Sequence, residues 1–176
     1  EERRAAIIEA VRPLLADYGE AITTKQIACA AGIAEGTIFR VFADKDELLD
    51  ATLDASFDHE TFEAALRAID GGLPFEQHLV EAPVLIQRRV VDVWTLVSHL
   101  GPKRHDQLRR PMTDSPALAE IFAAHRDRIR VEPAVAARHL RALTLSLTHP
   151  MIAAEAAEAS DIVDTVLHGI GTGTST

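Results

Sequence analysis

Hydroxyl and basic side chains recur at short intervals near the start of this chain. Thr37 and Arg40 are three residues apart and would share one face of a helix. A threonine can bond a phosphate and touch a thymine methyl group, while an arginine can bond guanine O6 and N7 or clamp a phosphate. Lys25 and Lys45 place positive charge at two predicted helix starts. These residue types at this spacing suit contact with the phosphates and base edges of double-stranded DNA.

The residues around them predict two short helices joined by a tight turn. Thr23, with Gln26 three residues later, has the pattern of a capping box at a helix start. Gly32 suits the left-handed position that ends this helix, and residues 35–42 are predicted to form the second one. Asp44 would cap a further helix. A helix-turn-helix of this kind presents its second helix to the DNA major groove.

Several of these residues occur at the spacing of a sequence motif found in a known protein family. Thr-Thr-x-x-Ile-Ala, then Ala-Gly-Ile, Gly-Thr-Ile-Phe, Phe42, and Lys45 with Leu48 resemble the N-terminal domain of the TetR family of transcriptional repressors. The resemblance covers roughly residues 3–53. Beyond that segment the chain resembles the family in architecture only.

The resemblance implies an all-α chain in two parts. A three-helix helix-turn-helix DNA-binding head would occupy residues 1–48, and a helical ligand-binding and dimerisation domain would occupy residues 49–176. Composition agrees, because aromatic residues are only 5% of the chain and no segment alternates like a sustained strand. Helical periodicity after the head predicts segments at residues 53–69, 75–82, 84–100, 114–130, 133–148 and 160–169.

The resemblance also implies a set of DNA contacts. In the family, the positions that match Thr24, Thr37, Phe39, Arg40 and Lys45 commonly contact DNA. The residue types add Lys25 for its charge and Gly36 for the close backbone approach that it permits. The chain departs from the family at Ala34, where Ser is frequent, and this loses a side-chain cap worth about 1 kcal/mol. It departs again at Phe39, where Tyr is usual, so the phosphate contact of a Tyr hydroxyl is lost.

The charge of the chain argues against strong DNA binding. The net charge is −9 and the isoelectric point is near 5.3. Residues 1–50 carry six basic and ten acidic side chains, whereas a basic face is the usual sign of DNA binding. We therefore expect few contacts per subunit, doubled in a dimer. The alternative is a helical small-molecule-binding protein with weakened or no DNA affinity.

The last two predicted helices carry apolar faces that could be core or a subunit interface. One face holds Ala136, Leu140, Leu143, Leu147 and Met151, and the other holds Ile162, Val166 and Ile170. Periodicity alone does not separate the two possibilities. The resemblance implies a homodimer through these two helices on a palindromic operator, with recognition helices about 34–36 Å apart.

A small-molecule effector is the remaining partner that the resemblance implies. Candidate contacts, all in the second domain, are Phe62, Arg89, Trp94, His99, Phe122 and His149. Ligand sites are mostly apolar with a few polar groups, which these residues could supply. Core packing is the competing explanation for the apolar members of the set.

Other classes of protein find little support in the sequence. Residues 58–60 read Asp-His-Glu without the second histidine of a zinc protease motif, and no phosphate-binding glycine loop precedes a helix. A small helical enzyme stays a third hypothesis without catalytic spacing, and no metal or cofactor is predicted. The single cysteine, Cys29, and the lack of a signal or membrane segment favour the cytoplasm. The basic cluster Lys103, Arg104, His105, Arg109 and Arg110 is either a solvated connector or a second phosphate contact.

Overall fold

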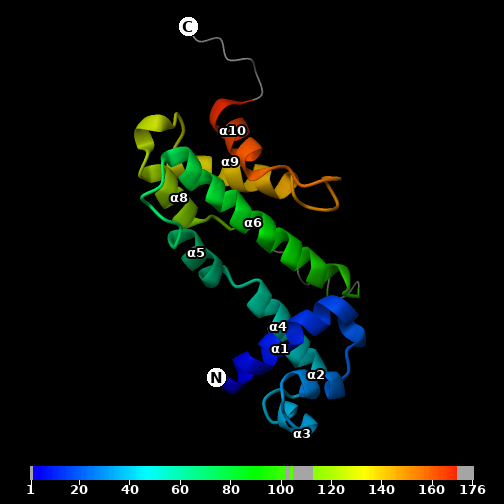
Figure 1. The fold of residues 1–176 in the computed structure, drawn as a ribbon. Coiled ribbons are helices and arrows are strands. Elements are labelled where there is room, and N and C mark those ends of the chain that lie inside the picture. Colours follow the sequence, from blue (N-terminus) through cyan, green and yellow to red (C-terminus); the bar gives the residue numbers. More distant parts are fainter. Residues whose placement is uncertain (1, 102–103, 105–112, 170–176) are drawn as a thin grey trace. The chain divides into compact units, whose positions relative to one another are not determined.

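The computed structural model describes residues 2–101, 104 and 113–169, and every regular element in these residues is helical (Figure 1). The predicted all-α fold class is confirmed. The elements are α1 (Glu2–Tyr18), η1 (Gly19–Ala21), α2 (Thr24–Ala30), α3 (Glu35–Ile38), α4 (Lys45–Ser56), α5 (His59–Arg67), α6 (Phe75–Ser98), α8 (Pro116–Ala123), η2 (Arg126–Arg128), α9 (Pro133–Ser146) and α10 (Ala159–His168).

The chain divides into two compact units that differ from the predicted domains. The head unit comprises residues 1–58 and 93–110, and the second unit comprises residues 59–92 and 111–176. The predicted boundary after residue 48 falls inside α4, which belongs wholly to the head unit. Helix α6 contributes residues to both units.

The head unit is built on the packing of α1 against α4. Helix α1 buries Ile7, Val11 and Leu15 on one face, at the three- and four-residue spacing of an amphipathic helix. Helix α4 buries Leu48, Leu49 and Leu53, which join the same cluster. This core also holds the inward side chains of the two short helices between α1 and α4, and so it fixes their position.

The second unit has a core of its own, shared by α5, α6, α8, α9 and α10. Fifteen buried residues form one cluster there. Phe75 and Phe122 meet edge to face within it, with ring centroids 6.4 Å apart. Helix α9 packs against both α8 and α10, and α5 packs against α8.

Three helix boundaries predicted from periodicity are wrong. The segment predicted at residues 53–69 is divided, because α4 ends at Ser56 and α5 begins at His59. The break at Pro83 is absent, since α6 runs through this buried proline, whose nitrogen cannot donate a helical hydrogen bond. The segment predicted at residues 114–130 is helical only over α8, after which the chain tightens into the 3₁₀ turn η2.

Helix α6 is the longest helix that the structure describes, with 24 residues. Neither this helix nor any other described one is long and apolar enough to cross a membrane.

Candidate DNA interface

Helix α2 has the start and the end that its sequence predicts. Thr23 Oγ1 accepts a hydrogen bond from the Gln26 backbone N–H at 3.2 Å, and Gln26 Oε1 accepts one from the Thr23 backbone N–H at 2.8 Å. This reciprocal pair is the predicted capping box. Gly32 has φ of +66°, the left-handed conformation that glycine adopts without steric cost. The turn that follows is therefore set by local sequence.

Helix α3 is shorter than predicted, covering residues 35–38 rather than 35–42. Its N-cap residue Ala34 makes no side-chain capping bond. At Arg40 and Val41, backbone hydrogen bonds join residues three apart instead of four. The Arg40 N–H donates to Thr37 O and the Val41 N–H donates to Ile38 O. β-Branched and aromatic residues have weak helix propensity, and the missing cap removes further support. Burial of Ile38 and Phe42 in the head core holds the segment in place.

The predicted DNA-binding residues lie on the outward side of this segment or beside it. Lys25, Gly36, Phe39 and Arg40 are exposed, and Thr24, Thr37 and Lys45 are half-buried. The Arg40 guanidinium forms no ion pair with a residue in the described part of the chain. A Cβ atom built on Gly36 would meet no atom from outside its own helical turn within 4 Å, so packing within the head does not require glycine there.

Two of the seven predicted residues already have partners within the head. Thr24 Oγ1 donates a hydrogen bond to the Glu35 carboxylate, which joins the start of α2 to the start of α3. Lys45 Nζ donates a 2.7 Å hydrogen bond to the backbone carbonyl of Glu20. An ammonium group has three donors, so Lys45 keeps two for a phosphate. The seven residues are thus held by one scaffold, the head unit.

A cluster of charged residues in the head was missed by the sequence interpretation. The Arg104 side chain, 12% exposed, lies 2.8 Å from Asp46, 2.9 Å from Asp50 and 3.5 Å from Glu20. Burial acts to lower the pKa of Arg104, but hydrogen bonds to Asp46 and Asp50 outweigh it and raise the pKa further above its usual value. Arg104 therefore stabilises the head itself. The other members of the predicted basic cluster lie outside the described residues.

Three of the predicted effector contacts lie in or against the core of the second unit. Phe62 and Phe122 are buried in its core cluster. The Arg89 guanidinium lies over the Phe62 ring, 4.9 Å from its centroid. Two apolar side chains in a packed core leave little room for a ligand, which agrees with the alternative of core packing.

The remaining three are spread over the chain. Trp94 and His99 belong to the head unit. His99 Nδ1 lies 2.9 Å from the Thr95 carbonyl, and His149 Nδ1 accepts a 3.2 Å hydrogen bond from the Met151 N–H. The six predicted residues are therefore divided between the two units. A cavity in the second unit is lined instead by residues between Thr113 and Arg141 that the sequence did not single out.

Comparison with known proteins agrees with this architecture. Residues 7–52 match the family model described as bacterial regulatory proteins, tetR family. The fold is similar to the crystal structure of a TetR/AcrR-family regulator from Thermobifida fusca, with 23% identity, a TM-score of 0.62 and coverage of 97% of this chain and 100% of that one. The fold is also similar to a bacterial regulatory protein in the tetR family from Rhodococcus RHA1, with 19% identity, a TM-score of 0.54 and coverage of 98% of this chain and 99% of that one. A third similar structure is a TetR-family regulator from Haemophilus influenzae, with 19% identity, a TM-score of 0.53 and coverage of 85% of each chain.

The fold is similar to that of these solved helix-turn-helix regulators. Within the head unit, residues 7–52 are similar to the N-terminal segment of the tetR family of bacterial regulatory proteins.

Proposed function

We propose that this protein is a dimeric transcriptional repressor of the cytoplasm, which binds a palindromic operator and is released by a small-molecule effector. The observation that carries the proposal is the outward face of α3 and the turn after it. Thr37 and Arg40 are held there by burial of their neighbours Ile38 and Phe42, and Arg40 has no ion pair within the described residues. Such a pair of side chains can enter a major groove and meet base edges.

The other predicted contacts would position the head on the phosphates. Lys25 is exposed and charged, and Lys45 has two N–H groups left after its bond to Glu20. Thr24 would add a hydroxyl donor near the same backbone after its hydrogen bond to Glu35 is exchanged for one to a phosphate. Phe39, 50% exposed, would pack against the sugar-phosphate backbone because it has no polar group to donate. Gly36 would let the protein backbone approach the DNA closely.

Dimerisation would compensate for the small number of contacts in each head. Residues 1–50 carry more acidic than basic side chains, so one head alone would bind DNA weakly. We assign the interface to α9 and α10, as the resemblance implies. Ala136, Leu140 and Ile162 pack in the core of their own subunit, which leaves the outer surfaces of these helices for a partner. Met151, which follows α9, is 74% exposed and adds apolar surface.

The alternative function is a helical small-molecule-binding protein without DNA affinity. The net charge of −9 favours it, as does Glu35, an exposed carboxylate in the first turn of α3. Phosphates would be repelled by that carboxylate unless it bonds a cytosine amine or stays with Thr24.

A gel-shift assay at low salt with the DNA that flanks the protein's own gene separates the two functions. The repressor hypothesis predicts a retarded complex whose affinity falls linearly on a log–log plot against salt. Absence of any retarded complex would reject it in favour of the alternative. Sedimentation at micromolar concentration tests the dimer, since a mass near the 19.1 kDa of one chain would exclude it.

A further inference from the structure

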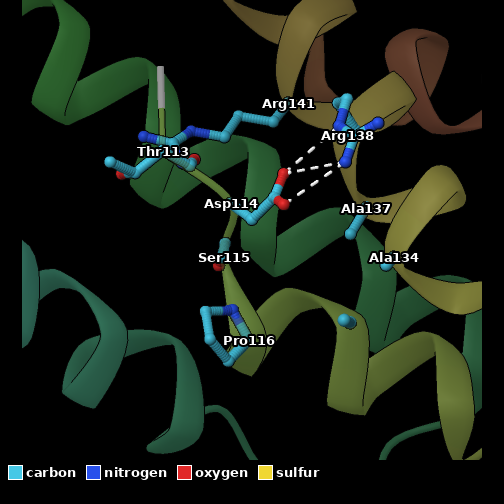
Figure 2. Close-up of a pocket in the computed structure, with 9 residues that line it drawn as sticks. Thr113, Asp114, Ser115, Pro116, Ala134, Ala137, Arg138 and Arg141 are labelled. Atoms are coloured by element: carbon cyan, nitrogen blue, oxygen red, sulfur yellow. Dashed lines mark hydrogen bonds and ion pairs between the residues drawn. The ribbon is translucent and has the colours of Figure 1, made fainter. Parts of the chain in front are cut away.

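The second unit contains a cavity of about 190 Å³ between the start of α8 and one face of α9 (Figure 2). Its apolar side is formed by Pro116 and by three alanines, Ala119, Ala134 and Ala137. For comparison, an apolar cavity of about 150 Å³ in another protein holds one benzene molecule. The space therefore suits a small ring or a short aliphatic chain.

The polar side of the cavity has two arginines whose partners differ. Arg138 is paired with Asp114, with Nη2–Oδ distances of 3.1 and 3.3 Å and an Nε–Oδ1 distance of 3.2 Å. Figure 2 shows the Asp114 carboxylate turned to Arg138, while the Arg141 side chain extends toward Thr113. Arg141 Nη1 donates to the Thr113 carbonyl. Within the described residues, the Arg141 guanidinium forms no ion pair with a carboxylate.

The two carboxylates that influence Arg141 are committed elsewhere. Asp114 is held by Arg138. The buried Glu63 carboxylate accepts hydrogen bonds from Ser115 Oγ at 2.6 Å and from the Ala117 N–H at 2.8 Å. Both attract the Arg141 charge only at longer range.

Among the residues that the structure describes, none fully compensates the charge of the half-buried Arg141. Desolvation lowers the pKa of the guanidinium, and the attraction of Glu63 and Asp114 only partly opposes it. Arginine stays protonated in proteins, so the group remains a cation in a half-buried position. A desolvated cation with free donors is costly unless an anion neutralises it.

We propose that this cavity binds a small organic carboxylate, with its carboxylate on the Arg141 guanidinium and its hydrocarbon part against Pro116 and the alanines. A guanidinium fork matches the two oxygens of a carboxylate, and Arg141 Nε and Nη2 form no hydrogen bond within the described residues. The apolar wall selects an acid with a hydrocarbon body over inorganic phosphate. The proposal rests on the proposed function to the extent that the bound acid would be the effector.

Calorimetric titration of the full chain with four probes tests the ligand chemistry. Benzoate and hexanoate carry the charge, and benzamide and hexanamide are their neutral counterparts of nearly equal size. We expect the acids to bind at least about tenfold more tightly than the amides, because hydrogen bonds to charged groups are the stronger ones. Equal binding of acids and amides, no binding of any probe at millimolar concentration, or tighter binding of inorganic phosphate would overturn the proposal.

Variants test the assignment to this cavity. Arg141→Met should weaken acid binding by about 10- to 100-fold while leaving amide binding unchanged, and Arg141→Lys should fall between. Ala134→Leu, at an exposed position of α9, should fill the cavity and abolish binding of all probes without loss of thermal stability. Arg88→Met removes an exposed arginine from α6 and serves as the matched control. If Arg141→Met is unstable, Ala134→Leu decides, and unchanged acid binding in that variant contradicts the proposal.

Gel-shift assays with the same acids separate this proposal from the proposed function. Binding by calorimetry without release of DNA would support the carboxylate site and remove the effector role. DNA binding without any acid binding would support the repressor and reject the site. A chain that binds acids but no DNA would support the site and reject the repressor.

Discussion

Lys45 Nζ donates a 2.7 Å hydrogen bond to the backbone carbonyl of Glu20, so α4 is joined at its first residue to the turn that follows α1. The Glu20 carboxylate continues the connection, since Oε1 accepts from the Gly101 N–H at 3.0 Å and lies 3.5 Å from Arg104. Glu20, in the turn after α1, thus connects that turn to the start of α4 and to the segment at Gly101 and Arg104. Lys45 has a structural role in addition to its proposed contact with DNA.

Replacing Lys45 with Met should therefore change two properties. Loss of the bond to Glu20 should lower the free energy of unfolding by about 0.5–1.5 kcal/mol. Loss of the phosphate contact should lower the salt slope of DNA binding by about one. Urea denaturation and gel shifts over a salt series measure the two effects. Lys25→Met is the matched control, because Lys25 is exposed and should change only DNA binding. Equal stability of the two variants would contradict the structural role.

Replacing Gly36 with Ala should weaken DNA binding without lowering the stability of the head. A Cβ atom at this position would meet no atom from outside its own helical turn within 4 Å, and the φ of Gly36 is not in the left-handed region. Gly36→Ala should leave the free energy of unfolding unchanged or raise it by about 0.5–1 kcal/mol, because alanine loses less backbone entropy in a helix. DNA affinity should fall, since the added methyl group would occupy the space between α3 and the DNA backbone.

The control for Gly36→Ala is Gly71→Ala, in the turn before α6, where an added Cβ atom also meets nothing. That variant should bind DNA like the unchanged protein. If Gly36→Ala binds DNA with full affinity, close backbone approach at α3 is excluded.

Local sequence was sufficient to predict the ends of α2 and the start of α4. Thr23 with Gln26, and Asp44 with the Glu47 N–H at 2.8 Å, are bonds between residues three apart, and a short sequence motif contains both partners. The length of α3 was not predictable in this way. Apolar spacing continues to Phe42, but the spacing does not reveal where i+3 bonds replace helical ones.

Contacts between residues far apart along the chain could not be predicted from local sequence patterns. Arg104 lies in a basic run, and its partners Asp46 and Asp50 are more than fifty residues away along the chain. The cavity at Arg141 has the same origin, because α8 and α9 form its walls only after they pack. The predicted effector contacts were selected for residue type, and bulky aromatic side chains such as Phe122 are used to fill the core.

Arg40 should affect sequence preference more than it affects stability. It is exposed, so Arg40→Ala should change the free energy of unfolding by less than about 0.5 kcal/mol. If the guanidinium bonds a guanine, the variant should lose about 1–3 kcal/mol of discrimination at one base pair of the operator. Competition gel shifts with single-base operator variants measure this. A uniform loss across all operators would assign Arg40 to a phosphate instead.

Glu63 should be the most sensitive acidic residue of the second unit. Its side chain is 6% exposed and accepts hydrogen bonds from Ser115 Oγ and the Ala117 N–H, which joins α5 to the start of α8. Glu63→Ala would leave both donors buried without an acceptor and should cost about 2–4 kcal/mol. Glu63→Gln keeps one acceptor oxygen and should cost less.

Thermal and urea denaturation of Glu63→Ala, Glu63→Gln and the control Glu155→Ala should rank them in that order of destabilisation. Glu155 is exposed in the segment before α10, so its loss should change stability by less than about 0.5 kcal/mol. Ser115 also lines the cavity beside Arg141, so Glu63→Ala should weaken benzoate binding as the start of α8 loosens. Stability of Glu63→Ala equal to that of Glu155→Ala would show that water replaces the carboxylate and that α5 does not hold this wall of the cavity.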